Sequence, residues 1–126
     1  RDRLLQLQVP EEQLPNLYRN SVAFVFPSLM EGFGLPVLEA AASGCPVVLS
    51  DIPVFREQAN TWAEFFDPRS PEALTGALEA VIDSPLRGVA PEAVRENLPT
   101  WSDAANQHAQ VYRLVTGEEF EIGSDF

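Results

Sequence analysis

The chain has 126 residues, 45% of them hydrophobic and 21% charged, which is typical of one soluble globular domain. Acidic residues outnumber basic residues 19 to 8, and the formal net charge is −11. This balance argues against nucleic acid or an anionic membrane as a partner, although backbone N–H groups can still hold a small anion. The single cysteine, Cys45, excludes an internal disulfide and is expected to be a small buried residue.

The first twenty residues predict a strand and a helix. Residues 4–9 alternate apolar and polar side chains, which predicts a short strand. A proline followed by two acids is typical of a first helical turn, so a helix is predicted over residues 10–20. Pro15 should kink or restart this helix because it lacks an amide N–H.

The rest of the chain alternates strands and helices. Apolar runs over residues 22–26 and 46–49 predict strands that are covered on both faces. The other predicted elements are helices over residues 35–43, 53–59, 71–83, 91–97 and 103–115 and a weak strand over residues 63–66. Ser70 and Ser102 are the expected N-caps of the third and last of these helices. This alternation predicts an α/β fold, a Rossmann-like three-layer sandwich with a mostly parallel sheet. The folded domain is expected to span residues 1–116, and the acidic tail, residues 117–126, is expected to be mobile.

The turn over residues 28–35 carries the strongest functional pattern. It follows a predicted parallel strand, and ligands bind at the carboxyl ends of such strands. Gly32 and Gly34 allow a sharp turn and let a ligand approach the main chain. Amides at the start of the next helix, Gly34 and Leu35 among them, together with the helix dipole, suit a phosphate or a pyrophosphate.

Two carboxylates, Glu31 and Glu39, bracket this turn. Glu39 lies in an otherwise apolar helix, where burial of a lone carboxylate is costly, so a polar ligand such as a ribose with vicinal hydroxyls is predicted. Plainer interpretations stay open. The turn can be purely structural, Glu39 can be an exposed residue near the helix dipole, Glu31 can be solvated, and Phe33 can fill the core.

Other conspicuous side chains have simpler explanations. Trp62 and Trp101 are expected to pack in the interior, and His108 is expected on the surface. Arg56 and Glu57 are interpreted as a solvated ion pair. No metal site is expected from one histidine and one cysteine.

The motif as a whole resembles the retaining glycosyltransferases of family four, the group 1 class, which have the GT-B fold. The matching residues read P-S-x-x-E-G-F-G-L-P-V-L-E-A from Pro27, followed by G-x-P-V-V from Gly44. Glu31 and Glu39, with seven residues between them, match the family's E-x7-E motif. The similarity extends over about residues 4–116, so the chain resembles an incomplete C-terminal half of a GT-B fold.

This resemblance implies a function for each residue of the turn. A nucleotide-diphosphate sugar would be the donor, with Glu39 on the ribose hydroxyls and Glu31 beside the donor sugar as the catalytic residue. The backbone amides expected to contact the sugar and the diphosphate are those of Gly32, Phe33, Gly34 and Leu35. The sugar would be transferred with retention, and no metal or other cofactor is implied.

The chain departs from the family in what it lacks. We expect the acceptor site on an N-terminal domain outside this chain, and the family's Arg and Lys for the diphosphate are also missing. The chain alone is therefore expected to be inactive, and its location is expected to be cytoplasmic, with membrane association only through missing parts. The strand at residues 22–26 should have an open edge, filled by residues 4–9 or by another chain. The alternatives are a nucleotide-sugar epimerase or phosphorylase of the same architecture, or a degenerate domain that binds a partner or self-associates.

Overall fold

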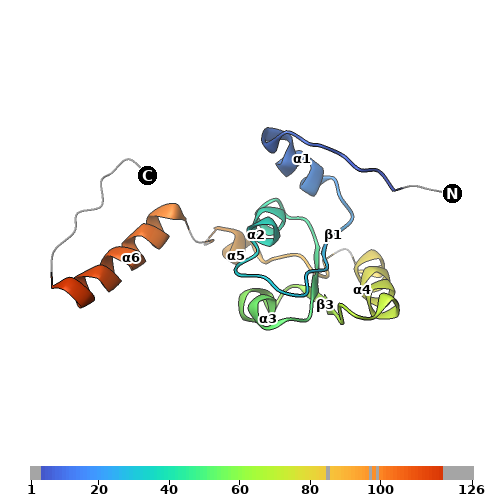
Figure 1. Ribbon diagram of the computed structural model, residues 1–126. Helices are drawn as coiled ribbons and strands as arrows, with labels where there is room; N and C mark the ends of the chain where they lie inside the picture. Colours follow the sequence, from blue (N-terminus) through green and yellow to red (C-terminus); the bar gives the residue numbers. More distant parts are fainter. Residues whose placement is uncertain (1–3, 85, 97, 99, 118–126) are drawn as a thin grey trace. The chain divides into compact units, whose positions relative to one another are not determined.

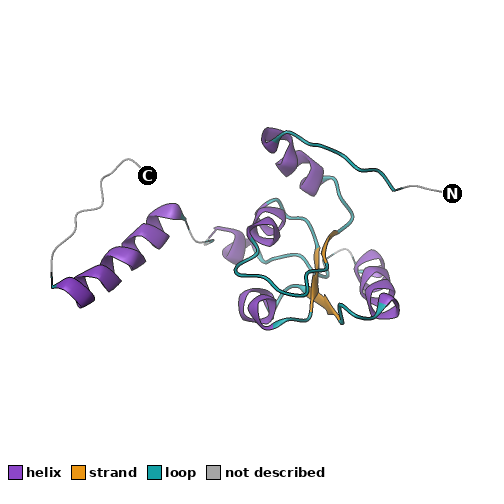
Figure 2. Ribbon diagram, in the orientation of Figure 1, coloured by secondary structure: helices purple, strands orange, loops and turns teal. Residues whose placement is uncertain are grey.

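The computed structural model describes residues 4–84, 86–96, 98 and 100–117, and the chain divides into two compact units, residues 1–96 and residues 97–126. The first unit contains a parallel three-stranded sheet flanked by helices (Figures 1 and 2). The elements in chain order are η1 (Glu11–Gln13, a 3-10 helix), α1 (Leu14–Arg19), β1 (Phe24–Phe26), α2 (Leu35–Ala42), β2 (Val47–Ser50), α3 (Pro53–Ala59), β3 (Glu64–Phe66), α4 (Pro71–Asp83), α5 (Glu92–Glu96) and α6 (Trp101–Thr116).

The sheet has the order β1-β2-β3, with β2 in the centre. Phe24 of β1 pairs with Val47, and Val48 pairs with Glu64 of β3, both in parallel register. All four residues of β2 are buried, as expected for a central strand covered on both faces. The predicted α/β fold with a parallel sheet is therefore confirmed.

Two hydrophobic clusters lie on opposite faces of the sheet because successive strand residues point to opposite sides. Val47 and Leu49 pack in one cluster with residues of α2 and α3, including Phe55. Val48 packs in the other cluster with Ala77 and Val81 of α4. In Figure 1, α2 and α3 accordingly lie on one side of the strands and α4 on the other.

The strand predicted over residues 4–9 is wrong. These residues form no regular element, and Leu4 is 94% exposed. An isolated extended segment has no neighbouring backbone to complete its hydrogen bonds, so alternation of side chains alone does not make it a strand. Within the described part of the chain β1 pairs with β2 alone, so residues 4–9 do not fill its other edge. Pairing of that edge with another chain stays a prediction.

The helix predictions differ from the structure mainly at the ends. α3 has the predicted bounds, and the Ser70 side chain accepts from the Ala73 amide at 3.1 Å, as expected for the N-cap of α4. Proline restarts the first helix, because Pro15 lies in the first turn of α1 after η1. Residues 22 and 23 lie outside β1, which begins at residue 24.

The second unit contains α6, and the predicted N-cap of this helix is wrong. Thr100 caps it instead of Ser102, because Thr100 and Asp103 form a capping box in which each side chain bonds the other residue's amide. α6 ends at Thr116 with Gly117 as its C-cap, and residues 118–126 of the acidic tail lie outside the described residues. The domain limits of residues 1–116 stay a prediction. Among the described helices none is long and apolar enough to cross a membrane.

Candidate functional site

The candidate site lies at the carboxyl end of the sheet, where β1 leads into α2 through residues 31–35, here called the glycine bend. Ser50, the last residue of β2, donates from its Oγ to the Phe26 carbonyl of β1 at 3.3 Å. This bond joins the carboxyl ends of two parallel strands. The bond fixes the end of β1, from which residues 27–30 lead to the bend, at the edge where α/β folds bind ligands.

The backbone amides of the glycine bend have no hydrogen-bond acceptor in the part of the chain that the structure describes. Among the described residues, none of the four amides at Gly32, Phe33, Gly34 and Leu35 donates a hydrogen bond to a protein acceptor. Gly34 is the N-cap of α2 with φ of 80°, and its carbonyl accepts from the Val37 amide at 3.0 Å. The first amides of a helix have no intrahelical partners and carry the positive end of its dipole. The four amides thus keep their hydrogen-bonding capacity for an anionic ligand that reaches them.

Helix α3 holds the bend from one side. The Gln58 side-chain Nε2 donates to the Phe33 carbonyl at 2.6 Å. A Cβ atom added at Gly34 would lie 2.8 Å from Cε1 of the fully buried Phe55, so only glycine fits this position. The Phe33 side chain itself is 47% exposed, which shows that the alternative of Phe33 as a core residue is wrong.

Glu31 lies half-buried at the start of the bend. Its Oε1 accepts a hydrogen bond from Ser28 Oγ at 2.7 Å. This bond restricts the carboxylate through one oxygen and leaves Oε2 with no protein donor among the described residues. Glu31 is therefore held in place but can still accept from a ligand hydroxyl.

Glu39 lies on α2, one turn beyond the bend, and its side chain is exposed. The expected burial of Glu39 is therefore wrong, and its exposure agrees with the plainer alternative, while its role toward a ligand stays a prediction. The carboxylate is nevertheless oriented, because the Tyr18 hydroxyl donates to Oε2 at 3.3 Å. Burial, followed by the neighbouring charge of Glu39, raises the pKa of Tyr18, so the hydroxyl stays protonated at neutral pH.

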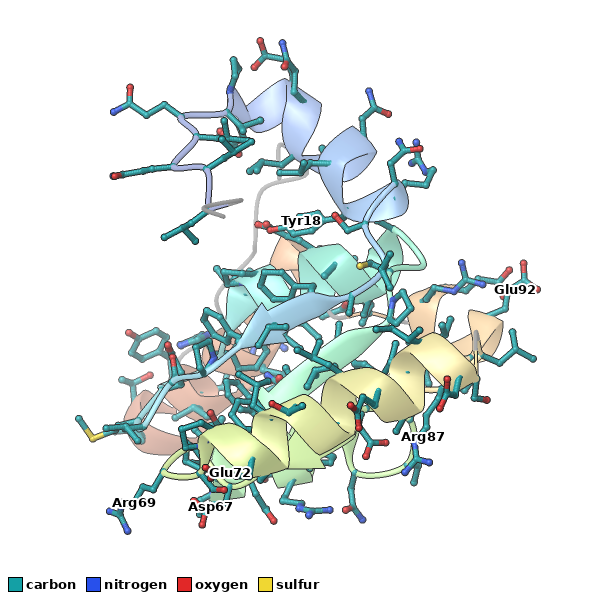
Figure 3. The ribbon with its side chains drawn as sticks, turned by 90° about the vertical axis from the view of Figure 1, so that its right-hand side faces the viewer. Tyr18, Asp67, Arg69, Glu72, Arg87 and Glu92 are labelled. Carbon is teal, nitrogen blue, oxygen red and sulfur yellow. The ribbon has the colours of Figure 1, made fainter. Side chains whose placement is uncertain are left out.

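Tyr18 is a site residue that sequence reasoning missed. It was predicted only as a helix residue, 21 positions before Glu39. The signal that it offered was a hydroxyl on an otherwise apolar helix face, which usually finds a partner when buried. Figure 3 shows Tyr18 between α1 and α2.

A pocket of about 440 Å³ lies beside Glu39, with η1 and α1 on one side and α2 on the other. Its lining residues are Glu11, Leu14, Pro15, Tyr18, Arg19, Glu39, Ala42 and Ser43. The wall combines apolar side chains with two carboxylates and one guanidinium. The pocket therefore offers both apolar contacts and charged hydrogen-bonding groups.

The carboxyl end of β2 carries an ion pair that differs from the prediction. Arg56 pairs with Asp51, not with Glu57, through two bonds of 2.7 and 2.8 Å. The Arg56 guanidinium also lies 4.0 Å from the centre of the Phe65 ring. The hydrogen bond from Arg56 lowers the pKa of Asp51, so this carboxylate stays charged at neutral pH.

The remaining sequence predictions are settled only where side chains are described. Trp62 and Cys45 are buried and His108 is exposed, as predicted. The side chain of Trp101 lies outside the described set. Within the described ranges, no group of three or more His, Cys, Asp or Glu side chains could hold a metal ion.

Comparison with known proteins identifies the class. The sequence profile of the family described as glycosyl transferases group 1 matches residues 4–100, and the chain belongs to this family. Together with the parallel sheet and its flanking helices, this makes the first unit a partial, Rossmann-like half of a GT-B fold.

Individual relatives agree with this assignment. The chain is 38% identical over 104 residues to the serotype-specific mannosyltransferase WbdA of Escherichia coli, covering 82% of this chain and 13% of that protein. It is 34% identical over 110 residues to the O-antigen chain mannosyltransferase B of Escherichia coli, covering 85% and 29%. The solved sucrose-phosphate synthase of Thermosynechococcus elongatus superposes with a TM-score of 0.74 at 28% identity, covering 87% of this chain and 29% of that one. The chain thus spans less than a third of the length of each of these proteins.

Proposed function

We propose that this chain is the donor-binding part of a retaining glycosyltransferase and that its ligand is a nucleotide-diphosphate sugar. The observation that carries the proposal is the glycine bend. The four amides at Gly32, Phe33, Gly34 and Leu35, which donate to no acceptor among the described residues, lie at the start of α2, and the two carboxylates of the family motif flank them. Either feature alone has a structural explanation, but together in a group 1 glycosyltransferase they favour a donor site.

The diphosphate would lie against the amides of the glycine bend. As the bond between the sugar and the diphosphate breaks, negative charge accumulates on the leaving group. N–H dipoles that are already oriented stabilise this charge without reorganisation, which lowers the barrier. The positive end of the α2 dipole acts in the same direction. In this proposal no metal ion or other cofactor is needed to bind the donor.

The two carboxylates would have different tasks. Glu39, oriented by Tyr18, accepts hydrogen bonds from the vicinal hydroxyls of the ribose. Glu31, held through Oε1 by Ser28, accepts from a hydroxyl of the donor sugar near the reacting carbon through Oε2. Transfer then retains the configuration of that carbon. The acceptor would bind to a domain outside this chain, so the chain by itself is proposed to be inactive.

Mannose is the first sugar to test, because two similar proteins are named as mannosyltransferases. Binding of GDP-mannose, UDP-glucose and UDP-N-acetylglucosamine to the chain is measured by calorimetry. Glu39→Gln should weaken binding of the preferred donor roughly tenfold to a hundredfold, because a hydrogen bond to a charged group contributes roughly 1.5–3 kcal/mol.

The matched control is Glu79→Gln, which changes an exposed glutamate on α4 and should leave donor affinity unaltered. A wild-type chain that binds none of the donors would refute the proposal. Equal affinity of the wild type and Glu39→Gln would refute the role of Glu39. In the intact protein that contains this chain, Glu31→Gln should lower the transfer rate far more than donor affinity.

A further inference from the structure

Gln58 is a residue that the family motif does not include, yet it contacts the candidate site directly. It lies on α3, 25 residues after Phe33, and its Nε2 donates to the Phe33 carbonyl at 2.6 Å. Phe55, one turn earlier on the same helix, packs against Gly34 so closely that a Cβ atom there would lie 2.8 Å from its ring. Helix α3 thus holds two successive residues of the glycine bend by two independent contacts.

The hydrogen bond from Gln58 also determines where the next amide points. The Phe33 carbonyl and the Gly34 N–H belong to one planar peptide, and no peptide bond of the structure is cis. In a trans peptide these two groups point in opposite directions. With the carbonyl held toward Gln58, the Gly34 N–H is directed away from α3. Gly34 is buried, and its amide donates to no acceptor among the described residues.

The Gln58 side chain is not fully satisfied in this arrangement. Its Oε1 is buried and has no hydrogen-bond partner within the described part of the protein. A buried acceptor without a donor lowers folding stability, and an apolar side chain of similar length would avoid this loss. The favourable contact of this side chain is therefore the bond from its Nε2 to the Phe33 carbonyl.

We infer that Gln58 is a positioning residue for the donor site: it holds the Phe33–Gly34 peptide so that the Gly34 amide is presented to the diphosphate. This inference rests on the proposed function, because it assumes that the ligand carries a diphosphate. Gln58 itself touches no reacting atom. Gln58 acts through the peptide and fixes the direction of the Gly34 N–H before the ligand binds. Binding then does not include the free-energy cost of ordering this peptide.

The test compares Gln58→Met with the wild-type chain. Methionine keeps the length of the side chain but removes both the donor and the buried Oε1. NMR titrations with GDP and with guanosine give separate affinities for a ligand with and without the diphosphate, and UDP with uridine serves as a second pair. Gln58→Met should bind the diphosphate roughly twofold to tenfold more weakly, the range for one neutral hydrogen bond, and the nucleoside unchanged. Thermal stability should not fall.

A matched control is Gln107→Met, which changes an exposed glutamine on α6 and should alter neither affinity. A second measurement needs no variant. In the wild-type chain, GDP should shift the Gly34 amide proton more than the average backbone amide, and a hydrogen-bond coupling should connect the Gln58 side-chain nitrogen to the Phe33 carbonyl carbon.

The outcomes separate this inference from the proposed function. A wild-type chain that binds neither diphosphate overturns the proposed function, and the inference with it. If the wild type binds and Gln58→Met binds equally well, the inference alone is overturned. Equal weakening for diphosphate and nucleoside, together with lower thermal stability, also overturns it, because that pattern indicates a general structural role. A Gly34 amide proton that does not respond to bound GDP has the same consequence.

Discussion

The Tyr18 hydroxyl on α1 donates a hydrogen bond to the Glu39 carboxylate on α2, with 3.3 Å between Oη and Oε2. The Tyr18 ring is 9% exposed and packs edge-on against Phe24 of β1, with 5.3 Å between the ring centres. Glu39 itself is exposed. A residue anchored in the core therefore orients a surface carboxylate, and the helix that precedes the sheet becomes part of the candidate donor site.

Tyr18→Phe tests this relationship. The substitution keeps the ring and its contact with Phe24, but it removes the hydroxyl that donates a hydrogen bond to Glu39. Donor affinity should fall by about 0.5–1.5 kcal/mol, the usual net value of one hydrogen bond, while thermal stability changes less. Calorimetry with the preferred donor measures the effect. In a double-mutant cycle the substitution should have no effect in a Glu39→Ala background, and an undiminished effect there would show that Tyr18 acts independently of Glu39.

Alkaline pH should weaken the fold through the same tyrosine. Burial, followed by the charge of Glu39, raises the pKa of Tyr18 above 10.0, its ordinary value. Above pH 10 the unfolded chain releases this proton before the folded chain does, so the stabilisation present below pH 10 is lost as pH rises through the folded-state pKa. Burial raises the pKa of Cys45 in the same way.

Urea unfolding between pH 8 and 11 measures this loss. Lysine does not contribute to it, because all eight basic residues are arginines. The loss of stability with pH should be smaller in Tyr18→Phe than in the wild type, and smaller again when Cys45→Ala is added. If all three proteins lose stability equally, neither group is responsible.

Gly34→Ala should destabilise the protein by about 1–3 kcal/mol, because a residue with a side chain is strained at φ of 80° and would collide with Phe55. Gly76→Ala is the control, and its effect on stability should have the opposite sign. It lies inside α4 with open space around its Cβ position, so alanine should stabilise the helix by about 0.5–1 kcal/mol. Urea unfolding of both variants gives the two signs. Two effects of the same sign would contradict the backbone conformation described for Gly34.

The pair of Asp51 and Arg56 should contribute to stability only where Asp51 is charged. Its hydrogen bond from Arg56 lowers the pKa of Asp51 below 3.8. The folded state therefore holds the carboxylate in its charged form at a pH where the unfolded state binds a proton. The stabilisation is complete above about pH 4, the ordinary range for aspartate, and disappears as pH falls through the lowered value.

Acid titration of the far-ultraviolet circular dichroism measures this dependence. Asp51→Asn should move the midpoint of acid unfolding to higher pH, and both carboxylate oxygens lie within 2.8 Å of Arg56. Asp83→Asn, at the exposed end of α4, is the control and should leave the midpoint in place. The prediction fails if the two variants have the same midpoint.

Thr100→Ala should loosen the start of α6. The Thr100 Oγ1 accepts from the Asp103 amide at 3.1 Å, and the substitution removes this bond at a cost of about 1 kcal/mol of helix stability. Hydrogen exchange of the first amides of α6 should accelerate about fivefold. Thr61→Ala, in the exposed turn before β3, provides the comparison and should leave these amides unchanged. Unaltered exchange in Thr100→Ala would contradict the capping box.

Several elements were predictable because their signals are local. Pro36 at the start and Gly44, with φ of 75°, just after the end mark α2, and Ser70 marks α4 through a bond to an amide three residues away. The apolar run over residues 46–49 predicted a strand covered on both faces, and all four residues of β2 are buried. The same local reasoning failed at residues 4–9, where alternation is present but no neighbouring strand completes the hydrogen bonds.

The sequence by itself determined the fold class, the acidic character and the family of this chain. It also located the two carboxylates on either side of the glycine turn. Only the tertiary structure decided which partners hold these groups. Tyr18 reaches Glu39 across 21 residues and Gln58 reaches Phe33 across 25, while Arg56 selects Asp51 instead of its neighbour Glu57. The reason is physical. A sequence motif determines the local conformation of a few neighbouring residues. The orientation of a side chain also depends on residues distant in sequence, which the fold packs beside it.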